Sequence, residues 1–463
     1  MKANLTNAGG IHMLPYKLSP SIWRVLNRWR EPERILINMK SKYLTRIIAL
    51  GSAVLVCAII SNAQSGASRP RRVNPQPPVS SAGNTGESSR QPARTSRQSS
   101  DSPLLTPVNA TATAPSSTPT STASSTPRAD TAHAYTLLQQ KQYAAAASEA
   151  RQLAAGNPTD PEAWKIAGFA EYNLKQYEEA AVDLQRALDL QRGAGQEDAN
   201  TVDALGQAYV LTEKFEQALP LLVNATTRKG TTPDAAMLYY RGVAEYRTGK
   251  TPDAERSFNA AVKANPKDAA SLYYLGQLAY ARNDLDGAIS ALNRSTLIDT
   301  RVASAWALLT TSYLRRAAAA TVPAKADADY LSAVRAGESL NRLKTDADAA
   351  TLFGQALIGA KQYPRAATVL ERAAAGDDAK GVTLYLLGVA HSRSKNFPKA
   401  IAALERASAK SPDDVNVYRE LGYAYEITKQ YAKALATYEK GMSLAPNDAD
   451  FKESAERVRP FAK

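Results

Sequence analysis

Cysteine and histidine are scarce in this sequence of 463 residues. The single cysteine, Cys57, excludes an intramolecular disulfide and any zinc site built on several cysteines. The three histidines, His12, His133 and His391, form no recognisable Ser-His-Asp or Cys-His arrangement. No glycine-rich phosphate loop follows a strand pattern. We therefore expect no catalytic residues, no metal and no cofactor, and a protein that is not an enzyme.

Large aromatic side chains are also few, with 4 Trp and 7 Phe, although apolar residues make up 44% of the chain. A core built from so little Trp and Phe relies on Ala, Leu and Tyr, and small side chains require backbones that approach closely. No strand pattern is evident. The composition therefore favours an all-α fold.

The folded part of the chain has little excess charge. The formal net charge is +13, but residues 1–64 carry nine Lys and Arg against two Asp and Glu, and residues 65–130 carry seven against three. Residues 131–463 therefore hold only +2. Because a nucleic-acid site needs its basic excess on the folded surface, we expect no nucleic-acid partner.

A signal-like segment spans residues 39–63. Lys40, Lys42 and Arg46 precede an uncharged run from residue 47 to 60, which ends at the small residues Ser61 and Ala63. This order is typical of a secretory signal peptide, and the run is shorter than the roughly 20 residues of a membrane span. An uncleaved signal anchor is the alternative. Either interpretation predicts an exported protein, periplasmic or membrane-tethered and facing outside the cytoplasm.

The segments on either side of the signal are unusual. Residues 1–38 include a basic amphipathic stretch, and we interpret them as an extension before a true start at Met39, or as a helix on a membrane surface. Residues 64–130 are rich in Ser, Thr and Pro and have no apolar period, which predicts a disordered linker. Its arginines either hold it near an anionic membrane or cell wall or are merely solvated.

A pattern of small and large residues recurs along the C-terminal two-thirds of the chain. It begins with glycine at Gly168, Gly206, Gly242, Gly276, Gly354, Gly388 and Gly422. Nine residues later comes a mostly large side chain: Tyr177, Phe215, Thr251, Leu285, Tyr363, Phe397 and Tyr431. Three further on is Ala180, Ala218, Ala254, Ala288, Ala366, Ala400 or Ala434. Such a sustained period predicts a solenoid of repeated helical hairpins.

The pattern resembles the tetratricopeptide repeat, a helix-turn-helix unit of about 34 residues. Further residues support the resemblance, an early aromatic in helix A and a closing proline after helix B: Trp164, Trp306, Pro158, Pro266, Pro412 and Pro446. It covers residues 131–446 and implies an all-α solenoid of about nine repeats. Residues 447–463 have apolar residues at helical spacing, which predicts a C-terminal capping helix.

The sixth repeat departs from the pattern. Thr310 stands where glycine is expected, and the segment around Thr321–Tyr330 is about eleven residues too long, with a break at Pro323. The insertion is either a partner-specific lobe or two helices lengthened past the usual turn.

Three acidic clusters suggest calcium at first sight: Asn283–Gly287, Ala326–Tyr330 and Asn447–Phe451. None continues into a complete calcium loop with its glutamate. We interpret them as turn and N-cap residues at the repeat joints.

The resemblance also implies a binding groove lined by helix A of each repeat. The corresponding positions are Lys165, Phe169, Tyr172, Tyr239, Tyr246, Tyr273, Tyr280, Tyr385, Arg393, Arg419 and Tyr423. Tyrosine dominates this set, and a rigid amphipathic ring suits the binding of a peptide or extended segment. The alternative for any single tyrosine is packing between repeats.

From these features we expect a non-enzymatic protein-protein interaction scaffold of a bacterial cell envelope, with a protein or peptide partner in the groove. The N-terminal segment could add membrane or cell-wall association. The alternative function is a structural assembly factor of an envelope secretion, pilus or polysaccharide-export complex.

Overall fold

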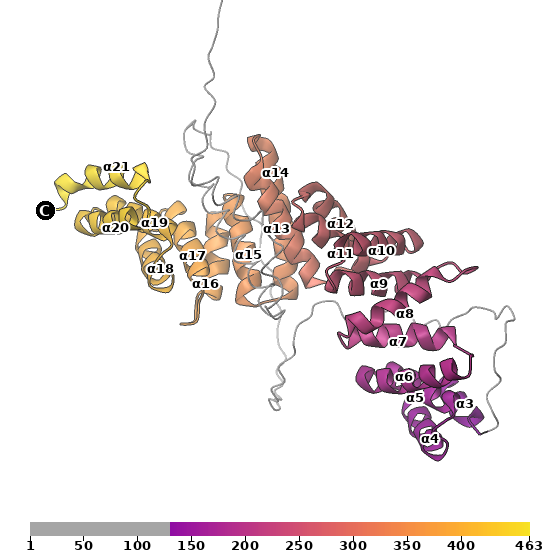
Figure 1. Cartoon of the computed structure of the whole chain (residues 1–463). Coiled ribbons are helices and arrows are strands. Elements are labelled where there is room, and N and C mark those ends of the chain that lie inside the picture. Colours follow the sequence, from indigo (N-terminus) through magenta and orange to yellow (C-terminus); the bar gives the residue numbers. More distant parts are fainter. Residues whose placement is uncertain (1–129) are drawn as a thin grey trace, which may run out of the picture. The chain divides into compact units, whose positions relative to one another are not determined.

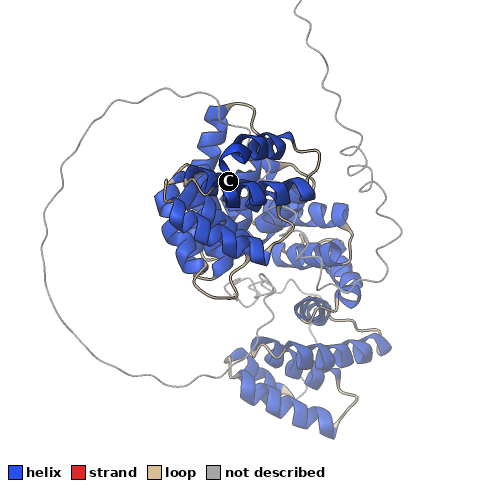
Figure 2. Cartoon of the chain, turned by 90° about the vertical axis from the view of Figure 1, so that its left-hand side faces the viewer, coloured by secondary structure: helices blue, strands red, loops and turns tan. Residues whose placement is uncertain are grey.

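The computed structural model describes residues 130–463, which form an all-helical array (Figure 1). The interpretations made for residues 1–38, 39–63 and 64–129 lie outside the described residues. Within residues 130–463 there are nineteen α-helices, a short 3-10 helix and no strand (Figure 2). The all-α prediction is confirmed.

The helices form nine successive hairpins, α3–α4 to α19–α20, which matches the predicted number of repeats. The two helices of each hairpin pack on each other, and the second helix packs on the first helix of the next hairpin. The bounds are α3 (Ala132–Gln139), α4 (Tyr143–Gly156), α5 (Pro161–Asn173), α6 (Tyr177–Gly193), α7 (Ala199–Leu211), α8 (Phe215–Thr227), α9 (Ala235–Arg247), α10 (Thr251–Ala264), α11 (Ala269–Ala281), α12 (Leu285–Ile298), α13 (Ala303–Ala319), α14 (Pro323–Leu343), α15 (Ala347–Gly359), α16 (Tyr363–Ala373), α17 (Gly381–Arg393), α18 (Phe397–Lys410), α19 (Val415–Ile427), α20 (Tyr431–Leu444), α21 (Ala449–Val458) and η2 (Arg459–Phe461).

The recurring glycine of helix A allows the two helices of a hairpin to approach closely. A Cβ atom added at Gly276 would lie 2.6 Å from Cγ of Leu292, and one added at Gly388 would lie 2.4 Å from Cγ of Leu404. Real Cβ atoms do not approach other atoms so closely, because close-packed interiors have no spare volume. The glycine is therefore a packing requirement of the hairpin.

Eight of the nine hairpin turns, all except the lengthened sixth, place one residue in the left-handed backbone region, as at Lys175 with φ 63°. The N–H of Lys175 donates to the carbonyl of Tyr172 at 3.0 Å, and the N–H of Gln176 donates to that of Glu171 at 2.9 Å. These bonds satisfy the last carbonyls of helix A. The large residue that follows, Tyr177 in this repeat, begins helix B.

Aspartate caps the joints between many repeats. Asp268 accepts from the N–H groups of Ala270 and Ser271, and Asp414 from that of Asn416. In the predicted clusters, Asp284 and Asp448 cap α12 and α21 in the same way. These caps satisfy otherwise unpaired donors of the first helical turn.

The acidic cluster Ala326–Tyr330 has a different role from the one we expected. Asp327 and Asp329 lie inside α14, so they are not N-cap residues. Asp329 accepts two hydrogen bonds from the Arg316 guanidinium, and Asp327 lies 3.4 Å from Nζ of Lys361. The interpretation as a cap was wrong here because the helix begins earlier, at Pro323.

The insertion of the sixth repeat consists of two lengthened helices. Helix α13 has 17 residues and α14 has 21, with only a short loop before Pro323. Arg316 connects the two helices to each other through Asp329 and to the preceding repeat through Asp286. The second of the two sequence-based alternatives is therefore correct.

The core of the fourth and fifth repeats is aromatic. Phe258 and Tyr274 stack with ring centroids 4.8 Å apart, while Tyr239 contacts Phe258 and Tyr240. At the other end, Phe451 of α21 is buried against α20.

Among residues 130–463, no helix is long and apolar enough to cross a membrane.

Candidate protein-binding face

The first helix of each hairpin lies on one side of the array. Along most of the chain each odd-numbered helix contacts the next odd-numbered helix, as in α5–α7, α13–α15, α15–α17 and α17–α19. The even-numbered helices contact their own partner and the next odd-numbered helix. We call the side of the odd-numbered helices that faces away from the even-numbered ones the helix-A face. All eleven sequence-predicted binding residues belong to odd-numbered helices.

In the second repeat, the predicted residues contact the next repeats. Nζ of Lys165 lies 2.7 Å from Glu162 and 3.3 Å from Asp198, and these carboxylates outweigh burial, so the pKa of Lys165 is raised. The Tyr172 hydroxyl donates to Gln207 at 2.7 Å. Burial raises the pKa of Tyr172. Phe169 packs against the core. These side chains connect neighbouring repeats.

In the fourth and fifth repeats, the predicted tyrosines belong mainly to the core. Tyr239 is 2% exposed, and Tyr273 and Tyr280 are also buried. Tyr246 is half-buried and lies edge-on to Tyr274, at 5.5 Å between ring centroids. Burial raises the pKa of Tyr273 to about 12. Packing between repeats therefore accounts for most of the surface of these rings.

In the last two repeats, the predicted residues are more accessible. The Arg393 guanidinium makes two hydrogen bonds to Glu420, at 3.0 and 2.8 Å, and Arg419 pairs with Asp448. Tyr385 is buried, whereas Tyr423 is 41% exposed. The eleven residues thus lie in three separate groups, and Tyr423 is the most exposed of the tyrosines.

The helix-A face also contains glutamines that the sequence interpretation missed. Gln207, Gln277 and Gln355 each follow the recurring glycine directly, and all three are half-buried. The Gln277 amide nitrogen donates to the Tyr273 hydroxyl at 2.8 Å. Its amide oxygen is buried and has no hydrogen-bond partner within residues 130–463. These glutamines could have been identified from the sequence, because each is the residue immediately after a recurring glycine.

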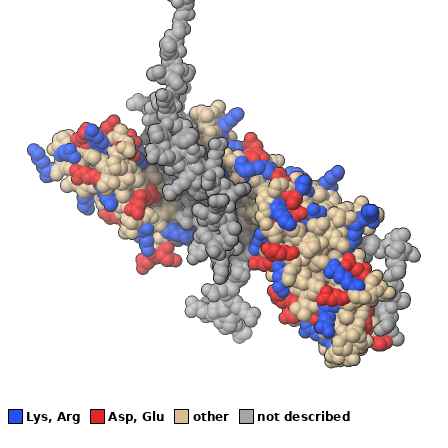
Figure 3. Space-filling view, in the orientation of Figure 1, with Lys and Arg blue, Asp and Glu red and all other residues tan. Residues whose placement is uncertain are grey.

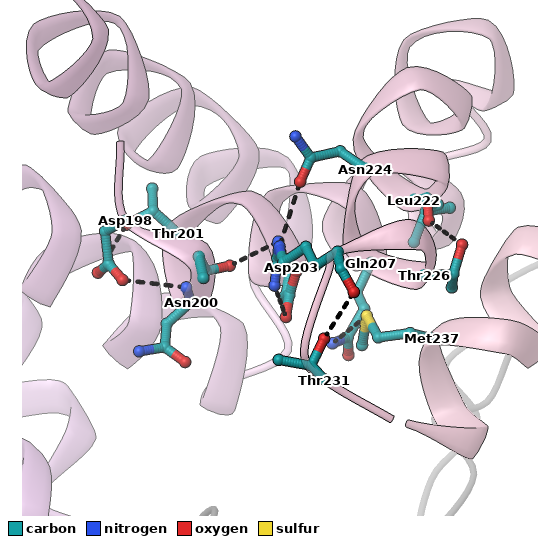
Figure 4. A network of polar contacts seen from close by, with 12 residues as sticks. Asp198, Asn200, Thr201, Asp203, Gln207, Leu222, Asn224, Thr226, Thr231 and Met237 are labelled. Atoms are coloured by element: carbon teal, nitrogen blue, oxygen red, sulfur yellow. Dashed lines mark hydrogen bonds and ion pairs between the residues drawn. The ribbon is translucent and has the colours of Figure 1, made fainter. Parts of the chain in front are cut away.

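A polar network supports the helix-A face between the third and fourth repeats (Figure 4). Arg228, just after α8, donates to both carboxylate oxygens of Asp203 on α7 and to the side chain of Asn224. Thr231 donates to the Arg228 carbonyl at 3.2 Å. The network fixes Asp203 on the helix-A face, while Gln207 lies one turn further along and contacts Met237.

The buried titratable residues His391 and Glu171 each have a structural partner. No cluster of His, Cys, Asp and Glu in residues 130–463 has a metal-binding arrangement. His391 is buried, which lowers its pKa, and lies 3.4 Å from Glu371. Glu171 is buried next to Asp183 and pairs with Arg151 at 2.7 Å. Burial and the Asp183 charge raise the pKa of Glu171 to about 8.

The sequence profile of the tetratricopeptide repeat matches residues 131–197, 204–255, 242–299 and 385–449, just under half of the chain. The unmatched gap includes the lengthened sixth repeat. No curated protein matches the sequence.

Several solved structures are similar to this chain in fold. YrrB, described as a TPR protein with an unusual peptide-binding site, is 17% identical over 44% of this chain and 99% of its own, with a TM-score of 0.37. The C-terminal part of a TPR protein from Cytophaga hutchinsonii is 17% identical over 63% of this chain and 99% of its own, with a TM-score of 0.38. MamA from Desulfovibrio magneticus RS-1 is 22% identical over 39% of this chain and 97% of its own, with a TM-score of 0.34.

Proposed function

Because the described part of this chain is built of tetratricopeptide repeats, we propose that it is a non-enzymatic scaffold that binds a peptide or extended segment of a partner protein on its helix-A face. Proteins of this repeat family generally bind other proteins. The observation that carries the proposal is the amide group of Gln277. It lies on that face, its nitrogen donates to the Tyr273 hydroxyl, and its oxygen has no hydrogen-bond partner within residues 130–463.

The chemistry of the helix-A face suits an extended main chain. An amide side chain can donate and accept, so Gln207, Gln277 and Gln355 can bond a peptide backbone without selecting its side chains. The Gln277 oxygen has no exposed surface in the unbound chain, so a peptide N–H reaches it only after the side chain turns outward. That bond would recover part of the about 1–3 kcal/mol that a buried acceptor without a partner costs. Tyr423 adds an exposed ring at the C-terminal end of the face.

Peptide selection tests this proposal directly. A phage library of random 12-residue peptides is selected on the full chain, and the enriched peptides are measured by fluorescence polarisation. The Gln277→Ala and Tyr423→Ala variants should bind these peptides roughly tenfold more weakly, the usual scale for losing one buried contact. Gln217→Ala, which changes an exposed amide on helix B, is the matched control and should bind normally. Absence of enriched peptides, or equal affinity of all variants, would contradict the proposal.

We further propose that the scaffold works in the cell envelope. Support comes from the signal-like order of residues 39–63 in the sequence. Cell fractionation with N-terminal sequencing of the purified protein tests it: a chain beginning near residue 64, or a full chain in the membrane fraction, is expected. Recovery of an intact chain from the cytoplasm alone would contradict it. Stable co-migration with a large membrane complex would favour the assembly-factor alternative.

A further inference from the structure

The hairpin turns of the seventh, eighth and ninth repeats share a basic sequence pattern. They read KQYPRA, KNFPKA and KQYAKA, with two cationic residues around an aromatic one and no acid. The equivalent turns of repeats two to five read KQYEEA, EKFEQA, GKTPDA and NDLDGA, and each contains at least one acid. We call the six cationic side chains of the C-terminal turns the basic rim: Lys361, Arg365, Lys395, Lys399, Lys429 and Lys433.

The packing of the helices places the three turns along one edge. Helix α17 contacts both α15 and α19, and α16 and α18 contact the next odd-numbered helix, so equivalent turns follow one another. Nζ of Lys399, in the eighth repeat, lies 3.0 Å from Glu371 of the seventh. All six rim side chains are exposed.

Most of the rim charge is not neutralised by the protein. Lys361 and Lys399 have acidic partners, Asp327 and Glu371. Within residues 130–463, the other four have none: Arg365 donates to the Gln362 side chain, Lys433 lies 5.3 Å above the Tyr425 ring, and Lys395 and Lys429 contact no carboxylate. On the parts of the described surface that are visible in Figure 3, basic and acidic side chains are interspersed.

Exposed apolar side chains lie next to the last turn of the rim. Ile427, two residues before Lys429, is 47% exposed. Phe461 is 63% exposed, and its ring lies 5.3 Å from that of Tyr431, which sits between Lys429 and Lys433. Large apolar groups exposed beside a cationic row suit an interface that supplies both negative charge and an apolar layer.

We propose that the basic rim, with Ile427 and Phe461, is a peripheral docking surface for an anionic phospholipid bilayer. Anionic headgroups match the four cationic side chains that lack acidic partners, and the interfacial region accepts aromatic rings and apolar side chains. An acidic protein segment would match the charge but provides no apolar layer for the exposed rings. The rim lies at the hairpin turns and not on the helix-A face, so this inference does not depend on the proposed peptide binding.

Vesicle co-sedimentation of the full chain tests the docking surface. The vesicles contain phosphatidylcholine alone or with phosphatidylglycerol. The rim variant combines Arg365→Glu, Lys395→Glu, Lys429→Glu and Lys433→Glu. Glutamate is compatible with the left-handed turn position, because Glu213 already occupies it with φ 60°. The matched control reverses four other exposed lysines that have no ion pair within the described residues: Lys263, Lys267, Lys410 and Lys452.

The two variants have the same net charge and the same N-terminal residues, so only the position of the charge differs. Each basic residue near an anionic membrane strengthens binding about fivefold, so the rim variant should bind phosphatidylglycerol vesicles roughly a hundredfold or more weakly than wild type. The control should lose much less. Wild-type binding should fall steeply when NaCl is raised from about 50 mM to about 500 mM.

A second variant tests the apolar part. Ile427→Ala with Phe461→Ala should weaken binding to phosphatidylglycerol vesicles several-fold while circular dichroism of the helices stays unchanged. Equal losses of vesicle affinity in the rim and control variants would overturn the proposal. Equal binding of wild type to vesicles with and without phosphatidylglycerol would also overturn it. Binding to polyglutamate without binding to vesicles would assign the rim to an acidic protein segment instead.

Discussion

Repeats two to five and repeats seven to nine share one hairpin design but differ in their cores and turns. In both regions the helix-A glycine meets a large side chain of helix B: Phe258 at Gly242 and Leu404 at Gly388. The fourth and fifth repeats fill their core with stacked aromatic rings, whereas aliphatic residues dominate the seventh and eighth. The turns change from mixed charge to purely basic. Both regions therefore keep the contact between the helix-A glycine and a large side chain of helix B, whereas the charge of the turn differs between them.

The largest expected effect compares the two kinds of core. Phe258→Ala should cost about 3–5 kcal/mol of folding free energy and Leu404→Ala about 2–4 kcal/mol, because the aromatic ring fills more volume and stacks on Tyr274. Urea titration followed by circular dichroism measures both. An equal or smaller cost for Phe258→Ala would show that the aromatic stacking adds no stability over the aliphatic core.

The second prediction tests the constraint that both regions share. Gly388→Ala should destabilise the chain by about 1–3 kcal/mol, because the new Cβ would overlap Leu404. Gly193→Ala is the matched control: no atom lies within 4 Å of the added Cβ, so this change should be neutral or slightly stabilising. The same urea titration applies. If Gly388→Ala were as neutral as the control, the close approach would not require glycine.

The third prediction concerns the joints between repeats. Asp268→Ala removes a buried cap that bonds two N–H groups and the Ser271 hydroxyl, whereas Asp414→Ala removes a cap with one bonded N–H group. Both changes should cost about 1 kcal/mol, with Asp268 at the upper end. Thermal unfolding monitored by circular dichroism gives the ranking. A larger loss for Asp414→Ala would contradict it.

A pH-dependent effect is expected at the junction of the first two repeats. The pKa of Glu171 is about 8 in the folded chain, above its ordinary value of 4.5, because of burial first and the Asp183 charge second. The folded state therefore binds the proton more tightly than the unfolded state. The stability from this proton is complete below about pH 4.5 and is lost as the pH rises through about 8.

Melting temperatures of wild type and Glu171→Gln between pH 5 and pH 9 test this. The variant should resemble wild type near pH 5 and melt at a higher temperature near pH 9, because glutamine carries no charge to bury. Glu453→Gln changes an exposed carboxylate of α21 and is the control. A pH profile of Glu171→Gln that is parallel to that of wild type would exclude Glu171 as the source.

Much of the fold could be predicted because the residues that define each hairpin all lie within that repeat. The glycine, the large residue nine positions later and the following alanine determine which faces of a hairpin meet, and these contacts occur within about 30 residues of sequence. Nine hairpins and the closing prolines followed from that period. The same reasoning failed at Asp327 and Asp329, because Pro323 starts a helix inside the insertion and moves the true joint.

The candidate site could be predicted only in part. The position of helix A and of its outward-facing residues follows from the period, so this set of residues could be chosen from the sequence. Which tyrosines remain accessible could not be inferred, because burial of a ring such as Tyr239 depends on Phe258 and Tyr274, which neighbouring helices contribute. The search for aromatic and cationic residues also passed over Gln277, whose unpartnered oxygen becomes evident only when its neighbours are in place.

The hairpin, its length, its turn and the charge of each turn follow from the amino-acid sequence, because these features depend on residues close together in the chain. The tertiary structure decided which side chains are covered and which carboxylates share a buried space, as with Glu171 and Asp183. The physical reason is that a repeat buries its surface against neighbouring repeats, so exposure and pKa depend on residues tens of positions away.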